Sequence, residues 1–92
     1  MKYRGRMDIV AKILEIAMNG AAKTTLMYRA YLSYAQIQEY VQFLTERKLM
    51  VLEAATNEYR VTQSGLRFLN AYDQIKDMVS LNTRGSRPSP TW

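Results

Sequence analysis

The stretch that decides the fold is residues 23–48, KTTLMYRAYLSYAQIQEYVQFLTERK. Within it, Ser33 and Gln36 make the Ser-x-x-Gln pattern of a capping box, in which two side chains bind free backbone amides at the start of a helix. The apolar residues that follow recur at steps of four and three, as one face of a helix requires: Ile37, Val41 and Leu44. This spacing predicts a helix that begins at the box and ends near Lys48.

A shorter helix is predicted immediately before this one. Thr24 or Thr25 can act as its N-cap, because a threonine oxygen accepts a hydrogen bond from a free amide. The helix would then turn Leu26, Met27 and Ala30 inward. Two helices separated by a few residues, the second beginning at its own cap, are typical of a helix-turn-helix motif.

Upstream of this motif, apolar residues at helical spacing predict a first helix over residues 7–18. Asp8 falls in its first turn, where a negative charge favours the helix dipole. Asn19-Gly20 is a typical stop signal. The motif is therefore preceded by one further helix.

Downstream of the motif the period of the apolar residues changes. A short apolar run over 49–52, turn-forming residues over 55–57 and alternation over 59–62 predict a hairpin of two short strands. Thr62 can cap a fourth helix over 63–80, in which Gly65 weakens the first turn slightly.

The predicted order is helix, helix, helix, hairpin, helix, which defines a winged helix-turn-helix domain: mainly α with a small β-hairpin (α+β). This domain covers residues 7–80 and is flanked by a basic arm over 1–6 and a flexible basic tail over 81–92. The basic side chains of these ends are Lys2, Arg4, Arg6, Arg84 and Arg87. They can enter a minor groove or simply be solvated.

The composition narrows the class of function. A chain of 92 residues has room for one domain, and 13 Lys and Arg against 8 Asp and Glu give a net charge of +5, which favours a polyanionic partner. The absence of cysteine and histidine excludes disulfide frameworks, zinc fingers and thiol or imidazole catalysis. No apolar run is long enough to span a membrane. We therefore expect a cytoplasmic protein that is not an enzyme and has neither a metal nor a cofactor.

The motif region resembles a known family. The residues that carry the resemblance are Asn19-Gly20, Lys23-Thr24-x-Leu26-Met27-Tyr28, Leu32-Ser33-Tyr34 and Tyr40-Val41-x-x-Leu44. They are similar to small archaeal winged helix-turn-helix DNA-binding proteins, namely the ten-kilodalton crenarchaeal chromatin-type proteins and related one-domain regulators.

This resemblance implies a homodimer that binds double-stranded DNA. In the chromatin-type members it also implies a long C-terminal helix that pairs as an antiparallel coiled coil. Here Gly85, Pro88 and Pro90 forbid a long continuation of the fourth helix. The dimer seam must therefore be shorter or built differently.

The residues expected to contact DNA fall into three groups. Phosphate contacts are expected from Lys23, Thr24, Thr25 and Arg29, near the start of the second helix. Base contacts in the major groove are expected from Ser33, Tyr34, Gln36, Gln38 and Gln42 of the third helix. Arg60 is the wing candidate. The alternatives are a solvated third-helix face, threonines that only cap, and core positions for Tyr28 and Tyr34 with exposed hydroxyls.

A dimer seam is predicted on the fourth helix, where Phe68, Tyr72, Ile75 and Val79 recur at steps of four, three and four. Leu66 and Leu69 lie elsewhere on the helix and can pack on the domain core. The alternative is one broad apolar face that folds back on the first helix.

Taken together, these patterns predict a homodimeric protein that binds double-stranded DNA. It would be a transcription regulator or a chromatin-type architectural protein, associated with the nucleoid, and a small-molecule effector stays an open question. The alternative is a winged-helix adaptor that binds other proteins without contacting DNA. Substitution of Lys23 and Arg29 distinguishes the two hypotheses.

Overall fold

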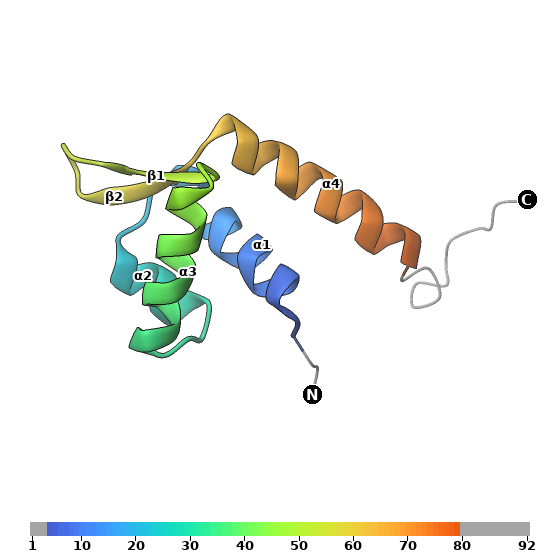
Figure 1. Cartoon of the computed structure of the whole chain (residues 1–92), viewed down its shortest axis with the longest axis horizontal. Helices are drawn as coiled ribbons and strands as arrows, with labels where there is room; N and C mark the ends of the chain where they lie inside the picture. Colours follow the sequence, from blue (N-terminus) through green and yellow to red (C-terminus); the bar gives the residue numbers. More distant parts are fainter. Residues whose placement is uncertain (1–3, 80–92) are drawn as a thin grey trace, which may run out of the picture.

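The computed structural model describes residues 4–79, and its elements follow the predicted order (Figure 1). They are α1 (Arg6–Ile16), one turn of 3-10 helix η1 (Ala17–Asn19), α2 (Lys23–Arg29), α3 (Tyr34–Glu46), β1 (Met50–Glu53), β2 (Glu58–Val61) and α4 (Gln63–Val79). The predicted fold, mainly helical with one antiparallel hairpin, is confirmed. Lys2, Arg84 and Arg87 of the predicted arm and tail lie outside the described residues.

The core lies where α1, α2 and α3 meet the hairpin. Its fully buried side chains are Ile13, Leu14, Leu26, Ile37, Leu44 and Met50. The predicted stripe of α3 is buried as expected, and Tyr40 joins it with only 8% of its surface exposed. The Arg6 guanidinium lies 5.3 Å from the centre of the Tyr40 ring, so this cation covers the edge of the core.

The start of α2 differs from the sequence-based prediction. Neither Thr24 nor Thr25 is the N-cap; the N-cap is Ala22, without a side-chain hydrogen bond. The reason is a long-range pairing, because Ala21 and Tyr59 exchange backbone hydrogen bonds of 3.0 and 2.7 Å. This bridge holds the chain extended up to Ala22, and the helix begins directly after it. Both threonines are therefore exposed residues inside the first turn of α2.

The predicted cap of α3 is confirmed. Ser33 Oγ accepts a hydrogen bond of 3.1 Å from the Gln36 amide, and Gln36 Oε1 accepts one of 2.9 Å from the Ser33 amide. These reciprocal bonds fix where α3 begins.

The turn before α3 is a Schellman motif, in which two amides beyond the end of α2 bind its last carbonyls. Leu32 N donates to Met27 O at 3.0 Å, and Tyr31 N donates to Tyr28 O at 3.2 Å. The motif places Tyr31 in the left-handed region with φ 58°. Arg4 then covers this end of α2, since its Nη1 donates to Ala30 O at 2.9 Å.

The last helix, α4, is joined to the domain by a capped corner. Thr62 Oγ1 accepts a hydrogen bond of 3.1 Å from Gly65 N and donates one of 2.7 Å to Lys48 O. Thr62 is thus the predicted cap and also binds the chain at the end of α3. Beyond this corner α4 runs past α1, and its second half projects from the domain (Figure 1).

A polar contact ties the start of α1 to the middle of α4. Tyr72 Oη donates to Asp8 Oδ1, and Asp8 Oδ2 accepts from Gly5 N at 3.0 Å. The bond from Tyr72, followed by the Gly5 amide, lowers the pKa of Asp8. Burial, followed by the bond to Asp8, raises the pKa of Tyr72 to about 12. Each partner thus stabilises the other in the ionisation state found at neutral pH.

We expect Tyr72→Phe to raise the pKa of Asp8 toward its ordinary value and to lower the free energy of unfolding by about 1 kcal/mol. Because the folded state lowers the Asp8 pKa, this stabilisation is present above about pH 4 and is lost as pH falls through the folded pKa. Because the folded state raises the Tyr72 pKa, it is also lost as pH rises from about 10 toward 12. NMR titration of the Asp8 carboxyl is the measurement, with Tyr28→Phe as control. An unchanged Asp8 titration would contradict the expectation.

Candidate nucleic-acid interface

The exposed side of α3 is mostly polar and also carries the carboxylates of Glu39 and Glu46. The five residues predicted to read bases are all exposed: Ser33, Tyr34, Gln36, Gln38 and Gln42. They lie on the surface left by the buried stripe, so α3 presents amide and hydroxyl groups outward and aliphatic groups inward. Such groups can donate to and accept from base edges in a major groove.

Lys23 connects the start of α2 to this face of α3. Its Nζ donates to Gln38 Oε1 and lies 5.4 Å from the centre of the Tyr34 ring. The half-buried lysine therefore lies over α3, and its charge is placed beside two of the predicted base-reading residues. The structure thus brings a predicted phosphate contact and predicted base contacts together.

All three glutamines already have partners within the domain, and that of Gln38 is Lys23. Gln36 uses its oxygen in the capping box, and Gln42 Nε2 donates to Glu46 Oε2 at 3.1 Å. A paired hydrogen bond to adenine needs both the oxygen and the nitrogen of the amide. In Gln36 the box uses one of the two lone pairs of the oxygen, so a paired bond to adenine would have to use the other one.

The charged residues in the stretch of chain that leads into α3 are all basic. Between Glu15 and Glu39 the sequence contains no acidic residue, whereas it contains Lys23 and Arg29. This stretch includes all of α2, the turn and the first residues of α3. No carboxylate of this stretch would repel a phosphate, whereas Glu39, directly after it, is exposed on α3.

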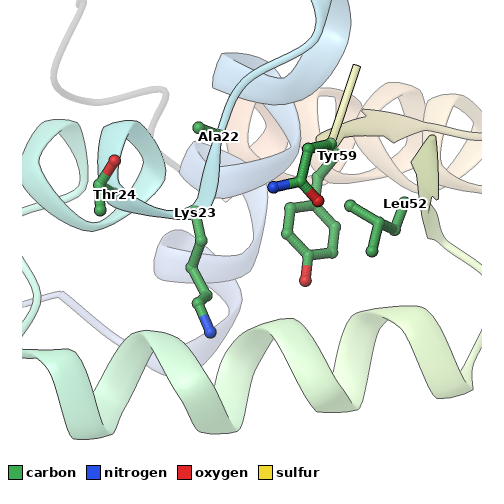
Figure 2. A pocket seen from close by; sticks show the side chains of 6 residues that line it. Ala22, Lys23, Thr24, Leu52 and Tyr59 are labelled. Carbon is green, nitrogen blue, oxygen red and sulfur yellow. The ribbon is translucent and has the colours of Figure 1, made fainter. Parts of the chain in front are cut away.

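A cavity of about 330 Å³ lies between the start of α2 and the hairpin (Figure 2). Its lining residues are Ala22, Lys23, Thr24, Leu52, Asn57 and Tyr59. Figure 2 shows the Lys23 side chain reaching from α2 toward α3 at the edge of this hollow. The hollow separates the helix-turn-helix from the hairpin.

The wing carries little positive charge. Arg60 Nε lies 3.2 Å from Glu53 Oε2, and Glu53 is paired across the hairpin with Glu58. The Arg60 guanidinium is therefore already beside a carboxylate of its own hairpin. A phosphate contact from Arg60 stays a prediction, and it would have to compete with this ion pair.

A profile of winged helix-turn-helix domains matches residues 3–80. The chain belongs to the winged helix-turn-helix family. This membership confirms the predicted fold and agrees with the expectation that the protein is not an enzyme.

Among solved structures, this winged helix-turn-helix chain is similar to Sso10a-2, a DNA-binding protein from Sulfolobus solfataricus. The TM-score is 0.71 over 97% of this chain and 100% of that chain, at 20% sequence identity. A search of curated proteins gives no match. The likeness shows a shared fold with a protein of the small archaeal kind that the motif region resembles.

In this winged helix-turn-helix domain the predicted dimer seam divides into two parts. Phe68 and Tyr72 are half-buried, pack against the core of their own domain and stack with ring centres 6.1 Å apart. Ile75 is 57% exposed, whereas the side chain of Val79 lies outside what the structure describes. Leu69 is buried, as predicted, but Leu66 is exposed. A seam with a second copy can therefore use only the outer part of α4 without rearrangement.

Three tyrosines are far more exposed than a core role allows. Tyr28, Tyr31 and Tyr34 expose 71%, 82% and 61% of their surface. The interpretation of Tyr28 and Tyr34 as core residues with exposed hydroxyls is therefore wrong. Sequence reasoning missed Tyr31. The signal that could have found it is its spacing of three residues from both Tyr28 and Tyr34, which spans a turn and not a single helix.

No metal site is evident within residues 4–79, since no three Asp or Glu side chains gather there in a way that could hold an ion. Nor is any helix in the same range long and apolar enough to cross a membrane.

Proposed function

We propose that this winged helix-turn-helix protein binds double-stranded DNA, with α3 in the major groove and the start of α2 on the phosphates. The observation that carries this proposal is the placement of Lys23 beside Gln38 and Tyr34 on the exposed side of α3, within a stretch of chain that has cations but no acidic residue. Phosphates would be contacted by Lys23, Thr24, Thr25 and Arg29. The exposed α3 residues, from Ser33 to Gln42, would meet base edges.

The mode of docking follows from the shape of the helix-turn-helix. In this motif the second helix enters the groove at its N-terminal end, and the first crosses the backbone. Ser33, Tyr34 and Gln36 lie at the start of α3, and Lys23 of α2 lies beside the Tyr34 ring. That Sso10a-2 is a DNA-binding protein supports the same use of a shared fold.

We further propose that the protein acts as a homodimer joined through the outer half of α4. Ile75 and Met78 expose 57% and 71% of their surface, and apolar side chains at such exposure gain from burial against a second copy. A two-fold dimer presents two α3 helices to successive major grooves, about 34–36 Å apart. A transcription regulator and a chromatin-type architectural protein share this binding step and differ in their preference for sequence.

The test is a titration of the purified protein into a fluorescent mixed-sequence duplex at increasing salt. If each dimer makes on the order of 6–10 phosphate contacts, the affinity should fall about 10³- to 10⁵-fold between about 50 and 200 mM salt. The same titration should saturate at two chains per short duplex. Absence of binding at the lower salt, or binding that salt does not weaken, would overturn the duplex proposal. Saturation at one chain would overturn the dimer.

A further inference from the structure

Tyr31 is held in a backbone conformation that tyrosine disfavours. Its φ of 58° lies in the left-handed region, at the position of the Schellman motif that glycine usually occupies. The motif is firmly closed, since Leu32 N and Tyr31 N both donate to carbonyls of α2. Because Tyr31 exposes 82% of its surface, its ring adds little packing that would offset this strain. Lys48 has the same conformation at the end of α3, with φ 60°, so the strain at Tyr31 indicates a function only together with its exposed ring.

In the sequence Tyr31 lies between two other exposed tyrosines, and we call Tyr28, Tyr31 and Tyr34 the tyrosine corner. They mark the last turn of α2, the turn itself and the first residue of α3. All three are more than 60% exposed, as their fractions of 71%, 82% and 61% show. A concentration of exposed aromatic surface at one turn indicates a binding site.

The charges around the tyrosine corner indicate an anionic ligand. Lys23 Nζ lies 5.4 Å from the centre of the Tyr34 ring, and the exposed Arg29 stands between Tyr28 and Tyr31 in the chain. The sequence has no carboxylate between Glu15 and Glu39. Exposed aromatic rings next to cations, without acidic neighbours, are the combination that binds single-stranded nucleic acid.

From these observations we propose that the tyrosine corner binds unpaired nucleotides by stacking their bases on its rings. In a duplex the faces of the bases are stacked on one another, so a duplex offers the tyrosines base edges, phosphates and sugars but no free base face. An unpaired base offers its face to a ring, while Lys23 and Arg29 attract the adjoining phosphates. This site shares Lys23, Arg29 and Tyr34 with the duplex interface proposed above, so unpaired nucleotides would bind there in place of a duplex, whereas Tyr31 belongs to this site alone.

The test compares binding of oligothymidine and oligouridine of about 12 nucleotides, a length in the range of known single-strand sites. Tyr31→Gly removes the ring and relieves the left-handed strain, so the melting temperature should stay equal or rise. Its affinity for the oligonucleotides should nevertheless fall about tenfold or more. Tyr31→Phe keeps the ring and should bind within about twofold of the original protein.

Binding of either oligonucleotide that Tyr31→Gly weakens and Tyr31→Phe preserves supports stacking. Comparison of oligothymidine with oligouridine shows whether DNA or RNA is the better ligand. The proposal is overturned if neither binds, which would leave the corner to a protein partner, or if Tyr31→Gly binds unchanged. It is equally overturned if Tyr31→Phe loses as much affinity as Tyr31→Gly, because the hydroxyl would then make the contact. A duplex titrated in parallel separates this failure from failure of the proposed function.

Discussion

Replacement of Gly65 by alanine is expected to destabilise the domain by about 2 kcal/mol or more, although it places a better helix former in α4. A β-carbon at this buried position would clash with the Leu49 carbonyl oxygen and lie 2.5 Å from Val61 Cγ2. The Leu49 carbonyl cannot easily move away, because it accepts a hydrogen bond of 3.1 Å from Thr62 N. The first turn of α4 would therefore be pushed off the hairpin.

The measurement is thermal or chemical unfolding, in which Gly65→Ala should lower the melting temperature by about 10 °C. Ser64→Ala is the matched control, because Ser64 is the exposed neighbour in the same helical turn. That variant should unfold within a few tenths of a kcal/mol of the original protein. A Gly65→Ala protein as stable as the control would show that α4 can dock without this close approach.

Removal of both cations of α2 should have the largest effect on DNA binding. In the double variant Lys23→Ala/Arg29→Ala, duplex affinity should fall at least about tenfold near 100 mM salt. The slope of log K against log salt should become shallower by about 0.9 for each phosphate contact that is lost. Both effects follow because Lys23 and Arg29 are the basic residues in the stretch of chain between Glu15 and Glu39, which contains no acidic residue.

The control for this experiment is Lys12→Ala/Arg67→Ala, which removes the same charge from exposed positions on α1 and α4. It should keep most of the affinity and the full salt slope, and melting curves should confirm that both variants fold. Equal binding by the two variants would contradict docking through α2. The helix-turn-helix surface would then be better explained as the binding face of a protein adaptor.

Much of the fold can be predicted from the sequence because its signals are local. The Ser33–Gln36 box acts within one helical turn and is found as expected, with bonds of 2.9 and 3.1 Å. The stripe of α3 and the cap at Thr62 are equally local and equally confirmed. Where a few neighbouring residues satisfy the backbone, their pattern alone is enough to place an element.

The features that sequence reasoning missed depend on residues far apart in the chain. The start of α2 is set by the pairing of Ala21 with Tyr59, so the prediction of a threonine N-cap was wrong. The bond from Tyr72 to Asp8 joins residues 64 positions apart. The sequence predicted only that Gly65 weakens the first turn of α4, whereas in the structure a side chain at this position would clash with Leu49 and Val61.

The candidate DNA surface could be predicted only in part. The residue types of α2 and α3 indicated phosphate and base contacts, and the structure places Lys23 with Gln38 and Tyr34. Which residues already bind one another could not be read from the sequence. The box partner of Gln36 was predicted, whereas the bond from Gln42 to Glu46 and the ion pair of Arg60 with Glu53 are seen only in the structure.

The contact from Arg4 to Ala30 has a consequence for how the protein can be labelled or extended. It fastens the beginning of the described chain to the end of α2, beside the turn that leads into α3. A tag, dye or additional domain attached ahead of Arg4 would therefore enter the molecule next to the helix-turn-helix and could obstruct it. An attachment beyond α4 would join at the end of a helix that points away from that turn (Figure 1). The two ends of this domain are thus unequal as points of attachment.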